Sequence, residues 1–182
     1  MKYMIASDLH GSAYFCQKML EAYEREEAEK LIFLGDLLYH GPRNELPIEY
    51  NPPKVISLLN ERKNEFLCVR GNCDAEVDQM VLTFPILAEY ALLSMDGLTV
   101  FATHGHVYNR ENLPPLKRGD ILLHGHTHVQ AMEKLGENWY LNPGSLSIPK
   151  ENNENSYMIY QDRNFTIKNL EGNVIKEMKY EI

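Results

Sequence analysis

Residues 2–36 read KYMIASDLHGSAYFCQKMLEAYEREEAEKLIFLGD, and this stretch decides the fold class. The apolar runs KYMIA and LIFL predict short buried strands, each ending at small or polar residues. Between them Phe15, Met19 and Tyr23 recur every four residues, which predicts an amphipathic helix that Ser12 can cap. A strand, a helix and a second strand in this order indicate a parallel α/β unit.

The rest of the chain adds further strands to this unit. Residues 66–69 predict a third buried strand, preceded by a helix that Pro52 and Pro53 open. The second half predicts successive strands with few helices, and the Asp96-Gly97 turn fits a hairpin. These later strands are expected at residues 86–93, 98–103, 120–123, 138–141, 157–160, 165–170 and 174–180.

Length and charge narrow the classes of fold and function. A chain of 182 residues is long enough for one domain, which is expected to span residues 1–182. With the strand pattern, this predicts an α/β fold with two stacked β-sheets. The formal net charge of -8 disfavours binding of long nucleic acid, which normally requires a basic face. It does not exclude a small phosphate ester, because bound cations would supply local positive charge.

The number of cysteines and the length of the apolar runs indicate the cellular compartment of the protein. Cys16, Cys68 and Cys73 are an odd number with no scaffold-like spacing, which indicates reduced thiols. The N-terminus lacks the unbroken apolar region of a signal peptide, and no run approaches the ~18 apolar residues of a membrane span. We therefore expect a cytoplasmic protein without a membrane partner.

Polar side chains collect where the predicted strands end. Because the carboxyl ends of parallel strands are where α/β sheets bind ligands, these distant positions are expected to meet in one crevice. They fall in five short segments: Asp8-Leu9-His10, Gly35-Asp36, Gly71-Asn72, Thr103-His104-Gly105-His106 and Gly125-His126-Thr127-His128.

The residue types in these segments fit divalent metals. Aspartate, asparagine and histidine offer oxygen and imidazole ligands, and the absence of a cysteine cluster argues against a structural zinc site. A bridging carboxylate can hold two metals about 3.5–4 Å apart, close enough to contact both the attacking and the leaving oxygen of a phosphoryl group. Hydrolysis of a phosphate ester is therefore chemically plausible.

The order and spacing of the five segments resemble those of the calcineurin-like metallophosphoesterases, in particular their compact bacterial and archaeal phosphodiesterase branch of the YfcE type. The resemblance covers residues 8–128. It implies a four-layer sandwich of two stacked mixed β-sheets flanked by helices. It also implies hydrolysis of a small phosphate-ester substrate, a diester rather than a monoester.

The resemblance further implies a dinuclear site. One metal would be bound by Asp8, His10, Asp36 and His128, and the second by Asp36, Asn72, His104 and His126, so that Asp36 bridges. Manganese is the expected metal, with iron, zinc and nickel as alternatives. A metal-bridging hydroxide would attack phosphorus in line, and no covalent enzyme intermediate would be needed.

Two positions depart from the family pattern. Gly35-Asp36 is followed by Leu37-Leu38-Tyr39, so the second aspartate of the usual Gly-Asp-x-x-Asp motif is missing. Cys73 stands where the family usually has the histidine thought to protonate the leaving oxygen. A thiol is a weaker donor than imidazolium, and two nearby cations would push it toward thiolate. We expect weak general-acid catalysis and a preference for good leaving groups, against the alternative that Cys73 is simply a small loop residue.

Other residues and functions stay open at this point. Arg43 is a candidate for binding substrate phosphate, or else a solvated loop residue. Asp74 is expected to orient a catalytic group or to cap a helix that begins at Ala75.

The alternatives to a phosphodiesterase are a phosphomonoesterase or phosphoprotein phosphatase, and a non-catalytic interaction scaffold like the retromer subunit of the same fold. A homo-oligomer would use apolar residues on the late strands.

Overall fold

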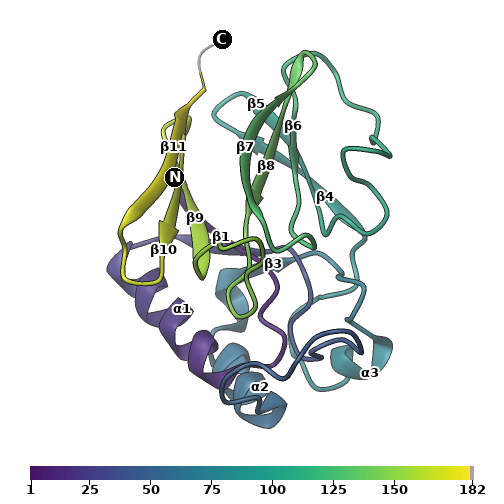
Figure 1. Cartoon of the computed structure of the whole chain (residues 1–182), viewed down its shortest axis with the longest axis vertical. Coiled ribbons are helices and arrows are strands. Elements are labelled where there is room, and N and C mark those ends of the chain that lie inside the picture. Colours follow the sequence, from purple (N-terminus) through teal and green to yellow (C-terminus); the bar gives the residue numbers. More distant parts are fainter. Residues whose placement is uncertain (181–182) are drawn as a thin grey trace.

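Two β-sheets stack face to face in the computed structural model, which describes residues 1–180 (Figure 1). Both sheets are mixed, and helices are few, as the sequence predicts. The helices α1 (Ala13–Arg25) and α2 (Pro52–Glu61) pack on the outer face of the larger sheet. The other helical elements within residues 1–180 are short, η1 (Lys63–Glu65) and α3 (Glu76–Gln79).

The six-stranded sheet contains the predicted β-α-β unit. Its strands β1 (Lys2–Ala6), β2 (Lys30–Phe33) and β3 (Phe66–Cys68) are parallel, with Met4 opposite Leu31 and Ile32 opposite Leu67. Ser12 caps α1 by accepting a hydrogen bond from the Phe15 N–H at 3.2 Å, as expected. The strand order is β11 (Val174–Lys179), β10 (Asn164–Asn169), β9 (Ser156–Gln161), β1 (Lys2–Ala6), β2 (Lys30–Phe33) and β3 (Phe66–Cys68).

The five-stranded sheet is built from the middle of the chain. Its central strands β5 (Leu98–Thr103), β6 (Ile121–Leu123) and β8 (Asn138–Pro143) are parallel, and the two outer strands are antiparallel to their neighbours. Its outer face carries a loop rather than a helix, and Tyr108 and Leu116 of this loop pack on Phe101 and Leu122. The strand order is β4 (Tyr90–Met95), β5 (Leu98–Thr103), β6 (Ile121–Leu123), β8 (Asn138–Pro143) and β7 (Gln130–Leu135).

Strand β1 is buried on both faces, which explains its unbroken apolar sequence. Met4 and Ala6 pack under the helices, whereas Ile5 points into the core between the two sheets. Because side chains alternate along a strand, neighbouring residues serve different cores. Each fully buried aliphatic side chain contributes roughly 1.5–3 kcal/mol of transfer free energy. The sheet that carries the functional segments is therefore fixed from both sides.

Two strands differ from the sequence-based expectation. Strand β7 was not predicted, because as an edge strand it carries Glu133 and Lys134 and shows no apolar run. Strand β4 begins at Tyr90 rather than at residue 86, because the backbone at Ile86 bonds a side chain instead of a neighbouring strand. The Ile86 N–H donates to Gln79 Oε1 at 2.9 Å.

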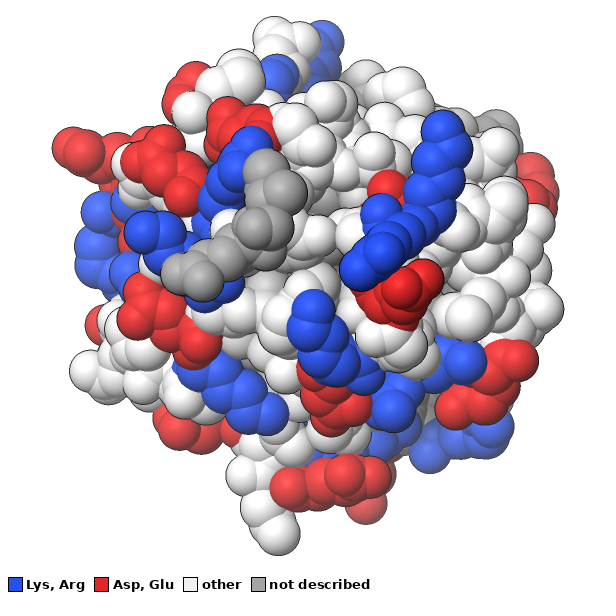
Figure 2. Space-filling model, turned by 90° about the horizontal axis from the view of Figure 1, so that it is seen from above, with Lys and Arg blue, Asp and Glu red and all other residues white. Residues whose placement is uncertain are grey.

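The surface charge bears on nucleic-acid binding, and the length and apolar character of the helices bear on membrane insertion. On the face seen in Figure 2, lysine and arginine side chains are interspersed with aspartate and glutamate. Such a surface differs from the basic face that long nucleic acid normally requires. Within residues 1–180, no helix has both the length and the apolar character needed to cross a membrane.

Candidate metal centre

Seven polar side chains from the ends of five strands meet at one place in the fold. The structure brings together all seven residues that the sequence analysis assigned to metals, and four of them are almost fully buried: Asp8, His10, His104 and Asp36 are at most 2% exposed. The segments follow β1, β2, β3, β5 and β6, which confirms that the strand ends converge. The seven residues are Asp8, His10, Asp36, Asn72, His104, His126 and His128.

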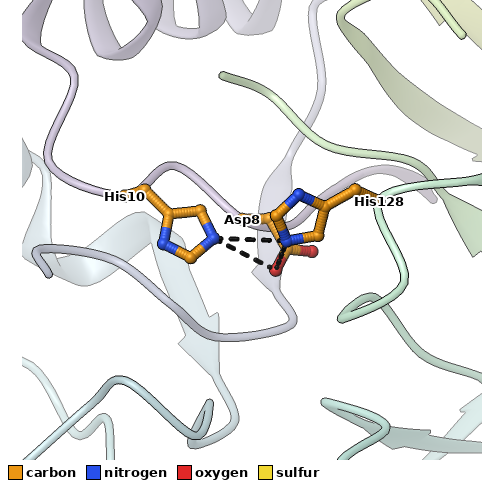
Figure 3. Close-up of side chains that lie close together, drawn as sticks. All are labelled: Asp8, His10 and His128. Atoms are coloured by element: carbon orange, nitrogen blue, oxygen red, sulfur yellow. Dashed lines mark hydrogen bonds and ion pairs between the residues drawn. The ribbon is translucent and has the colours of Figure 1, made fainter. Parts of the chain in front are cut away.

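The first group consists of Asp8, His10 and His128, whose side chains point toward one another (Figure 3). The Nε2 atoms of His10 and His128 are 3.3 Å apart. Asp8 Oδ1 lies 3.2 Å from Nε2 of His128 and 3.6 Å from Nε2 of His10. Three donor atoms therefore surround one small volume.

The second group lies around His104. Its Nε2 atom is 3.0 Å from Asn72 Oδ1, 3.2 Å from His126 Nδ1 and 3.4 Å from Asp36 Oδ2. Asp36 Oδ2 is also 3.7 Å from His10 Nε2 in the first group. Asp36 thus lies between the two groups, where a bridging carboxylate would be required.

Backbone carbonyls orient three of the imidazoles. Nδ1–H of His10 donates to Tyr39 O at 2.8 Å, and Nδ1–H of His128 donates to Ile148 O at 2.7 Å. Nδ1 of His104 lies 2.6 Å from Leu34 O in the same arrangement. Hydrogen bonds of this kind fix the ring of a metal-binding histidine and direct the Nε2 lone pair at the ion.

The buried donors fit a cation better than they fit one another. Asp8 Oδ1 is fully buried and accepts no hydrogen bond within the described residues. A buried carboxylate oxygen without a partner is costly, and so are two imidazole nitrogens that face each other with at most one proton between them. A divalent ion between these atoms would satisfy them all. The residues present therefore fit the metals that the sequence implies.

The backbone around the donors adopts an uncommon conformation. Five of the seven residues have positive φ angles between 51° and 64°. Non-glycine residues rarely adopt this region, and such strain is concentrated at functional sites. Gly71 allows a close approach in the same place, because a Cβ atom there would overlap the Asp36 carboxylate. The five residues are Asp8, His10, Asp36, His126 and His128.

The cluster also shifts the pKa values of its members. Burial alone would raise the pKa of Asp8, but the imidazoles of His10 and His128 outweigh it and lower the pKa well below the usual range. Burial would lower the pKa of His104, but the hydrogen-bonded Asp36 carboxylate raises it to about 9. Protons and metal ions therefore compete for the same atoms, and metal binding releases protons.

Asp74 supports the segment that carries Asp36. Its carboxylate accepts hydrogen bonds from the backbone N–H groups of Gly71, Asp36 and Leu37 at 2.7, 2.8 and 2.9 Å. The alternative that it caps a helix is wrong, because α3 begins at Glu76 and Asp78 bonds the backbone preceding it. Asp74 therefore positions a central residue of the site.

Cys73 lies at the same centre and is half-buried. Its Sγ atom accepts a hydrogen bond from Asn72 Nδ2 at 3.3 Å and belongs to a group with His10 and Asp36 whose ligand atoms lie within 4.8 Å of one another. Burial and the Asp36 carboxylate both raise the pKa of the thiol in the metal-free chain. The protonated form, which a general acid needs, is thus favoured there.

The donors open into a cavity of about 310 Å³. Arg43, which the sequence analysis proposed for substrate binding, lines this cavity. Lys150 also lines it, and sequence reasoning missed this residue because no motif surrounds it. The other lining residues are His10, Asp36, Gly41, Pro42, Asn44, Asn72, Cys73, His126 and His128.

Comparison with known proteins places this arrangement among phosphoesterases. Residues 1–164 match the family model described as the calcineurin-like phosphoesterase superfamily domain. The chain is 49% identical over 157 residues to phosphodiesterase YfcE of Escherichia coli K12, covering 86% of this chain and 85% of that protein. The solved structure of the E. coli phosphoesterase YfcE has a TM-score of 0.95 at 44% identity over 98% of this chain and 99% of that chain.

A more distant structural match shares the fold alone. A single mutant of Vps29 from Entamoeba histolytica superposes with a TM-score of 0.65 at 21% identity, and the match covers 100% of both chains. A likeness of this kind shows that the arrangement of sheets and helices is common to both proteins. Function has to be argued from the site.

Proposed function

The chain belongs to the calcineurin-like phosphoesterase superfamily and is a phosphoric ester hydrolase, and from that premise we propose that it is a dinuclear metal-dependent phosphodiesterase. The observation that carries the proposal is the convergence of seven oxygen and nitrogen donors in two groups linked by Asp36. The substrate is a small phosphate diester, like that implied by the name of the YfcE relative.

The proposed ligand sets follow the two groups. Asp8, His10 and His128 would hold one divalent ion, and Asn72, His104 and His126 the other, with Asp36 shared between them. Manganese is the expected ion, because mixed oxygen and imidazole donors suit it, as they also suit iron and zinc. When bound, the ions would supply a hydroxide for in-line attack on phosphorus and would neutralise the phosphoryl oxygens.

The chain's own residues have separate tasks in this proposal. Asp74 holds the backbone at Asp36, and the carbonyls of Tyr39 and Ile148 hold the histidines in position. Cys73, beside Asn72, would donate a proton to the leaving alcohol only weakly, because two nearby cations push a thiol toward thiolate. No side chain is required to form a covalent bond to phosphorus.

A scaffold function has less support than catalysis. A binding platform does not require buried, strained donors such as Asp8 and His128, whose φ angles of 59° and 62° carry a conformational cost.

The free thiols at Cys16, Cys68 and Cys73 agree with the proposed cytoplasmic location. Hydrolysis of monoesters or phosphoproteins stays an alternative that the same metals would support.

A hydrolysis panel tests the proposal. The manganese-loaded protein should hydrolyse bis(p-nitrophenyl) phosphate faster than p-nitrophenyl phosphate, and Asn72→Ala should abolish most of this activity. Asn64→Ala is the matched control, because Asn64 is an exposed asparagine in η1 outside the site. If the metal-loaded protein hydrolysed neither a diester nor a monoester, the proposal would be overturned in favour of a scaffold.

A further inference from the structure

Two cationic side chains lie in the wall of the metal cavity. Arg43 comes from the loop after β2, and Lys150 comes from the segment after β8. Among the described residues, 1–180, the carboxylate that lines the cavity is that of Asp36, a proposed metal ligand. In a protein with a net charge of -8, Arg43 and Lys150 therefore place two positive charges in the lining of this cavity.

Neither cation is neutralised by the protein. Within residues 1–180, the Arg43 guanidinium and the Lys150 ammonium have no carboxylate within 4.0 Å, and no side-chain hydrogen bond involves them. Two other arginines near the site behave differently. Arg70 pairs with Glu76 at 3.2 Å, and Arg110 pairs with Glu133 at 2.8 Å. The two cavity cations are thus free to bind an anion.

The Lys150 backbone is hydrogen-bonded to a proposed metal ligand, and the loop that carries Arg43 contacts another. Lys150 N–H donates to His128 O at 3.1 Å. Arg43 lies in a turn closed by Asn44, whose Nδ2 donates to His40 O at 2.8 Å, and the preceding Tyr39 carbonyl accepts from His10. The two side chains therefore start from fixed points beside the metal centre, on the His10 side and on the His128 side.

We propose that Arg43 and Lys150 bind a terminal phosphate on the alcohol part of the substrate, so that the preferred substrate is a phosphodiester carrying a second, monoester phosphate. This inference rests on the proposed function. The proposed metals would neutralise the single negative charge of the scissile diester phosphate. The second phosphate is a dianion and needs cations of its own. A guanidinium contacts two phosphate oxygens at once, and an ammonium adds a point charge.

Three matched substrates test the proposal on the manganese-loaded full chain. They are p-nitrophenyl propyl phosphodiesters whose propyl chain ends in a hydroxyl, a carboxylate or a phosphate. The phosphate-ended diester should show a kcat/KM about tenfold or more above the hydroxyl-ended one, because charge-assisted hydrogen bonds to a phosphate are strong. The difference should appear in KM. The carboxylate-ended diester should lie between them.

The variant Arg43→Ala/Lys150→Ala should bring the ratio between the phosphate-ended and hydroxyl-ended diesters close to one. Arg118→Ala is the control and should keep the wild-type ratio, because Arg118 is 83% exposed and pairs with Glu137 outside the cavity. Binding of 3-hydroxypropyl phosphate to the metal-free protein gives a second readout, measured by NMR titration. It should weaken in the double variant but not in the control.

Two results would overturn the inference while leaving the proposed function intact. One is equal KM values for all three diesters in the wild-type enzyme. The other is an equal loss of activity on all three in the double variant, which would place the two cations on the scissile phosphate instead. Hydrolysis of none of the diesters would instead contradict the proposed function itself.

Discussion

Two buried carboxylate clusters, one around Glu26 and one around Asp8, are built in opposite ways. Glu26 is 6% exposed, and its oxygens accept hydrogen bonds from Lys168 Nζ at 2.8 Å and Tyr157 OH at 2.8 Å, with Lys2 Nζ at 3.4 Å. Asp8 is completely buried, and its Oδ1 atom lies 3.2 Å from His128 Nε2 and accepts no hydrogen bond within the described residues. Lysine and tyrosine side chains satisfy the first cluster, whereas the second leaves a buried carboxylate oxygen without a hydrogen bond within the described residues.

The difference separates a stabilising site from a binding site. The Glu26 cluster joins α1 to β10 and β9 through charges of both signs, so folding alone satisfies it. The Asp8 cluster collects donors that need an ion, and its positive φ angles add strain. A fold that keeps such a cluster gives up some stability for function, as active sites commonly do. Mutations in the two clusters should therefore have separable effects.

The largest effect is expected at the shared carboxylate of the metal centre. Asp36→Asn should lower manganese-dependent kcat by at least about a hundredfold, because loss of even an outer-sphere partner costs 10- to 100-fold. The increase in melting temperature on adding manganese should also disappear, since stabilisation follows metal affinity. Asp162→Asn, at an exposed turn, is the control. Retained activity and retained metal stabilisation in Asp36→Asn would show that the donors do not act as a metal site.

The second prediction concerns stability without function. Glu26→Gln should lower the free energy of unfolding by about 1.5–3 kcal/mol, the usual contribution of hydrogen bonds to a charged group. Manganese-dependent hydrolysis should remain, because Glu26 ends α1 and does not line the cavity. Urea denaturation of the metal-free proteins measures the difference. A variant as stable as the wild type would remove the contrast between the two clusters.

The stability contributed by Glu26 should depend on pH. Burial would raise the pKa of Glu26, but Lys168 and Tyr157 outweigh it and hold the pKa below its ordinary value of 4.5. A carboxylate with a lowered folded-state pKa stabilises fully above its unfolded pKa, and the contribution is lost as the pH falls toward the folded pKa. The difference between wild type and Glu26→Gln should therefore be constant near pH 7 and shrink below about pH 4.5. A difference that grows on acidification would have the wrong sign.

The smallest expected effect is at Cys73, at the edge of the Asp8 cluster. Cys73→His should raise turnover of diesters with poor leaving groups, relative to activated ones, by a factor of roughly ten or less, because imidazolium is the better proton donor. Comparing an alkyl methyl phosphate with bis(p-nitrophenyl) phosphate measures the shift. An unchanged ratio between these substrates would leave the thiol as a loop residue of suitable size.

The sequence predicted the Asp8 cluster well and the Glu26 cluster not at all. The proposed metal donors follow strands that are easy to recognise, and parallel strands bring their ends together, so residues from Asp8 to His128 could be placed in one site. Glu26 and Lys168 are 142 residues apart and follow no motif. Their pairing depends on β10 joining the first sheet through β9, which no local pattern specifies.

The same reasoning explains why the sequence analysis did not predict Lys150 in the cavity or strand β7. Lys150 reaches the cavity through a loop whose path is set by a backbone hydrogen bond to His128. Strand β7 gains its place by pairing with β8, not by its own apolar pattern. Tertiary context decides such features, whereas the periodicity of β1 and α1 is a property of the local sequence.

The number of metal ions bound per chain tests the central claim most directly. Metal-stripped protein should be loaded with manganese, freed of excess ion by gel filtration, and analysed for manganese against protein concentration. Two groups of donors that share Asp36 predict two ions per chain, and Asp36→Asn should lower this number. One ion or none in the wild-type protein would contradict the dinuclear account.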